Sequence, residues 1–123
     1  MTDSGAYQTL KYGGVEVSSE EIVLFQEEID TDIATILDVP TGWDVSKRYA
    51  QYTVDETLKR ARELSNVKTR DDIAWVGPVQ GGQYFDLVAH SAREMGELPF
   101  EIYALGSPTQ VMEQYLFLSL IHI

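Results

Sequence analysis

The chain has 123 residues, of which 44% are apolar, so it can build the core of one small domain, and its lack of cysteine excludes disulfides and thiolate metal sites within these residues. Twenty acidic against nine basic side chains give a net charge of −11, which opposes binding to phosphate backbones at ordinary salt; a halophilic origin is the alternative, because screening at high salt allows even RNA-binding proteins an acidic surface. No apolar stretch is long enough for a membrane span and no signal peptide pattern is present, so we expect a cytoplasmic protein without a membrane partner.

The first predicted element is a helix over residues 18–30. It opens with Ser18 as a capping residue, followed by acidic side chains that suit the positive end of a helix. Four side chains recur at helical spacing and are expected to form its inner face: Ile22, Phe25, Gln26 and Ile29.

A buried strand and a long helix follow. Residues 33–38 form a short apolar, β-branched run that ends at the loop sequence VPTG. Residues 46–64, approximately, have the spacing of an amphipathic helix. We expect its inner side to consist of Tyr49, Tyr52, Leu58, Ala61 and Leu64.

The rest of the chain repeats this alternation. Residues 73–79 read as a strand, residues 84–98 as a helix and residues 100–106 as a third strand, and a capped helix start follows from Ser107. Continuous apolar strands between amphipathic helices predict an α/β fold with a parallel sheet covered by helices, either a doubly wound sheet or part of a (β/α)8 barrel.

Polar or glycine-bearing loops follow the predicted strands at Asp38, Gln80 and Gly106. The stretch DSGAYQ, residues 3–8, fits the same position after a strand that the chain lacks. Because the carboxyl ends of parallel strands share one edge, where such folds place their sites, we expect the four loops to converge. Each residue also has an ordinary interpretation, as a turn acid, a loop amide or a terminal segment.

Two other sites find little support. The run GPVQGG matches neither the dinucleotide-binding nor the P-loop pattern, and no acid follows at the distance that a ribose requires. His90 lies within a predicted helix without partners for a metal.

Four motifs in order, TDSGAYQ, TILDVPT, GPVQGG and IYALGSP, resemble the base-exchange site of tRNA-guanine transglycosylases, above all the archaeal, archaeosine-type branch. The resemblance runs from Met1 to about Phe117. It implies a (β/α)8 TIM barrel and a pentosyltransferase that replaces a D-arm guanine of tRNA with 7-cyano-7-deazaguanine through a covalent ribosyl-enzyme intermediate. Its partners would be tRNA, guanine and the deazaguanine, and the full-length protein would be a homodimer.

The resemblance also implies roles for residues near the start of the chain. Asp3 matches the general acid/base of the DSG motif, and Ser4 matches the neighbour that helps to position it. Tyr7 matches the aromatic side chain that stacks on the bound base.

Four further residues match positions that bind the base. Asp38 matches the acid that accepts hydrogen bonds from the guanine N1–H and exocyclic amine, and Gln80 matches the amide that donates to the base carbonyl. Gly106 and Ser107 match the backbone that closes over the base, where a bulky side chain would block the approach.

The chain departs from the family pattern in two respects. Nothing in it matches the nucleophilic aspartate or the Cys-rich zinc site of the complete family member, and residues 118–123 read as a tail outside the family, of the kind that a cloning artefact produces. We therefore expect residues 1–117 to be a partial TIM-barrel catalytic domain that is inactive in isolation, with zinc present only in the full-length protein. The alternatives are a noncatalytic tRNA-binding partner subunit and a purine-binding α/β module; Asp3 and Asp38 favour the enzyme.

Overall fold

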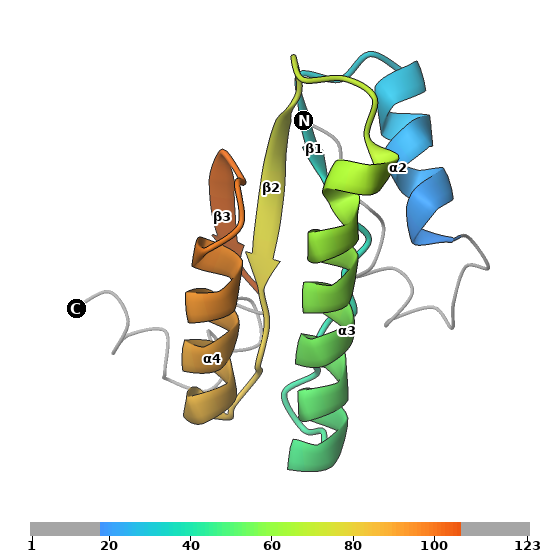
Figure 1. The fold of residues 1–123 in the computed structure, drawn as a ribbon. Coiled ribbons are helices and arrows are strands. Elements are labelled where there is room, and N and C mark those ends of the chain that lie inside the picture. Colours follow the sequence, from blue (N-terminus) through green and yellow to red (C-terminus); the bar gives the residue numbers. More distant parts are fainter. Residues whose placement is uncertain (1–17, 107–123) are drawn as a thin grey trace.

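The computed structural model describes residues 18–106, which form three strands and three helices in an alternating order (Figure 1). The elements are α2 (Ser19–Glu28), β1 (Ile33–Thr35), α3 (Lys47–Val67), β2 (Ala74–Val79), α4 (Phe85–Gly96) and β3 (Ile102–Leu105). The α/β class and the order of these elements are those predicted. The helix expected from Ser107 lies outside the described residues.

The three strands form one parallel sheet in the order β1-β2-β3. Ala34 pairs with Trp75, and Gly77 pairs with Tyr103. The strands point toward one end of the molecule, the end at which α3 and α4 begin (Figure 1). The loops after β1 and β2 are therefore at the carboxyl edge of the sheet.

Helices α3 and α4 pack side by side and both contact β2 (Figure 1). The core between these helices and the sheet contains Trp75, Val54, Leu58, Met95 and Phe100, all buried. None of the described helices is long and apolar enough to cross a membrane.

The inner faces of α2 and α3 differ in part from those predicted. For α2 the prediction is right for Gln26, which is buried with Val23 and Glu27, but wrong for Phe25 and for the C-cap residue Ile29, which are exposed. In α3 the prediction is right for Leu58, Ala61 and Leu64 but wrong for two aromatic residues, because Tyr49 is 43% and Tyr52 is 53% exposed. Their places inside are taken by smaller residues: Ala50, Thr53, Val54 and Thr57.

The buried amide of Gln26 explains the orientation of α2. Gln26 Nε2 donates to the Thr35 carbonyl at 2.6 Å, and the Thr35 N–H donates to Gln26 Oε1 at 3.0 Å. These are the two backbone groups that a neighbouring strand would pair with. The polar side chain of Gln26 therefore faces inward because it supplies the hydrogen-bond partners that the free edge of β1 needs at Thr35.

The buried carboxylate of Glu27 holds the turn before β2. It accepts from the backbone N–H groups of Thr69 and Arg70, each at 2.8 Å. The Arg70 guanidinium also pairs with two other acids: Nη1 lies 2.6 Å from Asp30 Oδ1, and Nη2 lies 2.6 Å from Asp72 Oδ2. The hydrogen bond from Arg70 lowers the pKa of the Asp72 carboxyl. Glu27 and Asp30 therefore have structural roles.

Candidate functional site

Three of the four predicted loops meet at the carboxyl edge of the sheet. Asp38 follows β1, Gln80 follows β2 directly, and Gly106 follows β3 directly. Gln80 Nε2 donates a hydrogen bond to Asp38 Oδ2, and Gly106 N donates to the Val79 carbonyl at 2.7 Å. The convergence expected from the sequence is thus confirmed for these three residues.

The Gln80 amide is buried and its orientation is set by its neighbours. Its Oε1 accepts from the Thr41 N–H at 3.2 Å, so its Nε2 faces Asp38. Its own backbone N–H donates to Ser91 Oγ of α4 at 3.0 Å. Gln80 is only 3% exposed. The loop after β1 holds its side chain, and α4 holds its backbone.

Asp38 is half-buried on a segment that leaves the sheet earlier than predicted. β1 ends at Thr35, although the sequence pattern continues to residue 38. The backbone of Leu37 and Val39, on either side of Asp38, is hydrogen-bonded to side chains of α3 instead of to a strand. The carboxylate is therefore carried by a loop that lies along a helix.

Two glycines keep backbone close to this pair. A Cβ atom on Gly106 would lie 2.6 Å from Gln80 Oε1 and 2.8 Å from the Val79 carbonyl oxygen, which real side chains do not tolerate. Gly81 has φ +142°, and a Cβ atom there would lie 2.6 Å from the backbone nitrogen of Val88. Both positions require glycine in this arrangement.

The remaining predicted site residues lie outside the described residues: Asp3, Ser4, Tyr7 and Ser107, together with the tail 118–123. Sequence reasoning also missed several polar residues that hold the site together: Thr41, Thr53, Thr57, Arg60 and Ser91. A signal was present, because Thr53 and Thr57 are polar, β-branched residues one turn apart on the side of a helix that carries Val54, Leu58 and Ala61.

The rim of the site carries opposite charges. Lys47 is in the first turn of α3 and Asp86 is in the first turn of α4, and Lys47 Nζ lies 2.7 Å from Asp86 Oδ2. This hydrogen bond lowers the pKa of the Asp86 carboxyl, and so do the backbone N–H groups at the helix start. Both side chains are largely exposed, so the pair adds little to stability.

Metal ligands are not grouped in the described part of the chain. Residues 18–106 contain no group of three or more His, Cys, Asp or Glu side chains that could hold a metal ion. The described residues therefore do not provide the zinc ligands that the resemblance implies for the complete family member.

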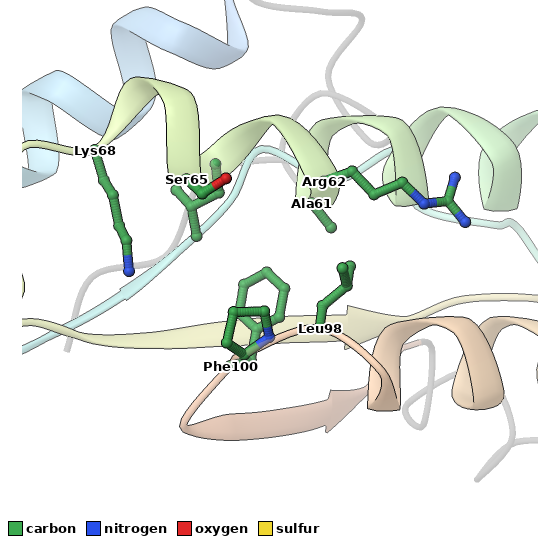
Figure 2. Close-up of a pocket in the computed structure, with 8 residues that line it drawn as sticks. Ala61, Arg62, Ser65, Lys68, Leu98 and Phe100 are labelled. Atoms are coloured by element: carbon green, nitrogen blue, oxygen red, sulfur yellow. The ribbon is translucent and has the colours of Figure 1, made fainter.

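A small pocket lies at the other end of the sheet, away from Asp38. Its volume is about 60 Å³, and Figure 2 shows Leu98 and Phe100 facing Ala61 of α3, with Lys68 and Arg62 nearby. None of its lining residues comes from the loops after the strands. It is thus separate from the candidate site.

These features define a class: a parallel α/β protein with a buried amide and a carboxylate side by side at the carboxyl edge of its sheet, where such folds bind polar ligands. Residues 1–122 match the family described as Queuine tRNA-ribosyltransferase, and the chain belongs to this family. The membership inferred from four short motifs is thereby confirmed.

Individual relatives are archaeal proteins named tRNA-guanine(15) transglycosylase. The chain is 53% identical over 118 residues to one from Aeropyrum pernix, 49% over 118 residues to one from Pyrobaculum aerophilum, and 44% over 119 residues to one from Methanocaldococcus jannaschii. Each match covers 95% of this chain but 23%, 24% and 18% of the relative, respectively. The chain thus spans less than a quarter of the length of these relatives.

Proposed function

We propose that the chain is a segment of a (β/α)8 barrel that exchanges a base in tRNA, and that its share of this reaction is to recognise the base. The observation that carries the proposal is the Asp38–Gln80 pair at the sheet edge of a chain so similar to tRNA-guanine(15) transglycosylases. In the complete protein a D-arm guanine of tRNA would leave, and 7-cyano-7-deazaguanine would replace it.

The pair suits the edge of guanine that carries a carbonyl oxygen beside two N–H donors. The Gln80 amide nitrogen has two hydrogens, of which Asp38 accepts one, and the other can donate to the base carbonyl. A carboxylate has about four acceptor sites, so Asp38 can accept from Gln80 and from the base. Adenine reverses donor and acceptor here and leaves buried groups unpaired, at a cost of about 1–3 kcal/mol each.

The proposed chemistry is that of a retaining glycosidase with a base as leaving group. A carboxylate attacks the anomeric carbon while the bond to guanine breaks, and Asp3 supplies the proton that leaves with the base. The incoming base then displaces the ribosyl ester and returns its proton to Asp3. No residue of this chain matches the nucleophile, so we assign it to the rest of a complete protein, which would also carry the zinc ligands and form a homodimer.

Four other residues have supporting roles in this proposal. Ser4 positions Asp3, and Tyr7 stacks on the base. The backbone of Gly106 and Ser107 closes over the base. The short distance between Gly106 and the Gln80 side chain supports this role.

The test replaces the matched 118-residue segment of the Aeropyrum pernix relative with this chain and measures incorporation of labelled guanine into tRNA. We expect exchange by this chimera, and we expect Asp38→Asn to raise the KM for guanine by about tenfold or more, because an amide cannot accept from both donors. Asp44→Asn, which removes an exposed carboxylate a few residues along the same loop, is the matched control and should leave KM unchanged. A chimera that folds but exchanges no guanine would refute the proposal, and so would a normal KM in Asp38→Asn.

A further inference from the structure

The loop that carries Asp38 is hydrogen-bonded to side chains of α3 at residues 37, 39 and 41. Arg60 Nη1 donates to the Leu37 carbonyl at 2.9 Å, and the Val39 N–H donates to Thr57 Oγ1 at 2.9 Å. Asp38 lies between these two contacts. Farther along the loop, the hydroxyl oxygens of Thr41 and Thr53 lie 2.6 Å apart.

The contact between the two threonines also has a direction. Thr53 Oγ1 donates to the Ala50 carbonyl at 2.7 Å, so its oxygen accepts from the Thr41 hydroxyl. Thr41 Oγ1 in turn accepts from the Gly81 N–H at 3.1 Å. This chain of hydrogen bonds joins the loop after β2 to α3 through the loop after β1.

The residues on the helix are spaced along one face, at positions 53, 57 and 60. Thr53 and Thr57 are 0% and 1% exposed, so valine would fill the same space without a hydroxyl to satisfy. Core packing alone does not account for two hydroxyls here, whereas the backbone and hydroxyl groups of the Asp38 loop do.

We propose that Thr57 and Arg60 are positioning residues for base recognition: they fix the backbone on both sides of Asp38 and so hold its carboxylate beside Gln80 and in the path of the base. This inference rests on the function proposed above. In this proposal both residues act through the backbone beside Asp38, which their side chains contact. Their loss would leave the carboxylate present but mobile, which weakens binding of the base more than it slows the chemistry.

The test uses the chimera with the Aeropyrum pernix relative and two pairs of variants. Thr57→Val removes the hydroxyl at nearly constant volume, and Thr57→Ser restores it. Arg60→Met is matched by Lys59→Met, which removes an exposed positive charge from the same helix. We expect Thr57→Val and Arg60→Met to raise the KM for guanine by about tenfold with kcat within about twofold, and Thr57→Ser and Lys59→Met to resemble the parent.

A merely structural role would give a different pattern. It would reduce the amount of folded enzyme, and hence kcat, while KM stayed the same. Hydrogen exchange supplies a second readout, since Thr57→Val removes the acceptor of the Val39 N–H and should speed its exchange, and Thr57→Ser should slow it again.

The outcomes separate the two proposals. If the parent chimera exchanges guanine but Thr57→Val keeps the parental KM, the positioning role is wrong and the proposed function stands. If the parent chimera exchanges no guanine, the proposed function fails, and the positioning role for base recognition fails with it.

Discussion

At the scale of single residues, Gly106 shows how little room the site has. Its missing Cβ would lie 2.6 Å from the Gln80 amide oxygen, and that oxygen is the group that orients the amide. A methyl group at this position must push Gln80 away from Asp38 or push β3 away from β2.

We expect Gly106→Ala to raise the KM for guanine in the chimera by about tenfold or more, because it displaces the donor that Gln80 offers to the base in the proposed function. Gly96→Ala is the matched control: nothing lies within 4 Å of a Cβ atom there, and alanine in a helix is favoured over glycine by about 0.5–1 kcal/mol. Thermal unfolding should show Gly96→Ala at or above the parental stability. Equal effects of both variants on KM would contradict the steric argument.

At the scale of elements, the fit between α2 and β1 depends on one side chain. The Gln26 amide supplies the donor and the acceptor that an adjacent strand would supply. Helix packing against a sheet is usually apolar, and here the contact that fixes the helix orientation is polar.

Gln26→Leu should therefore destabilise the fold although it places an apolar residue in a buried position. It leaves the Thr35 N–H and carbonyl without their partner, at a cost of about 1–3 kcal/mol for each group that water cannot reach. Urea unfolding of the chain would measure the loss, with Gln51→Met, at a less buried glutamine of α3, as the control. A Gln26→Leu variant more stable than its parent would show that burial outweighs edge pairing here.

The order and type of the described elements follow from their apolar periodicity, and the site residues Asp38, Gln80 and Gly106 follow from their places after strands. The inner faces of α2 and α3 do not follow in the same way. Periodicity places Gln26 inside correctly, but it does not place Thr53 and Thr57 there. These threonines are inside because backbone and hydroxyl groups of the neighbouring loop need partners. These hydrogen-bonding requirements arise only when separate segments of the chain meet in the folded structure, so the periodicity of one segment does not reveal them.

At the scale of the whole molecule, the free side of β3 is the main liability. In the described residues β3 pairs only with β2, and its side chains are open to solvent: Ile102 is 39%, Tyr103 46% and Leu105 52% exposed. An apolar strand with one unpaired edge favours association with other copies.

We expect the 123-residue chain to associate as its concentration rises, and we expect Ile102→Lys to reduce this, because a charge on an edge strand opposes pairing. Sedimentation velocity over a range of concentrations would measure it. Ile29→Lys adds the same charge at the exposed residue that follows α2 and is the control. If both variants reduce association equally, net charge and not the strand edge is responsible.

The Asp38–Gln80 hydrogen bond joins residues 42 positions apart, with α3 and β2 between them. Parallel pairing of β1 with β2 must close that loop first, and such distant contacts form late and slowly during folding. A growing or partly folded chain consequently has both side chains but not yet the hydrogen bond between them, so the base binding proposed above requires that β1 and β2 have already paired. If the base binds only the finished edge, as the proposed function requires, it favours the folded state by mass action, and the fraction of folded chain rises with the concentration of base.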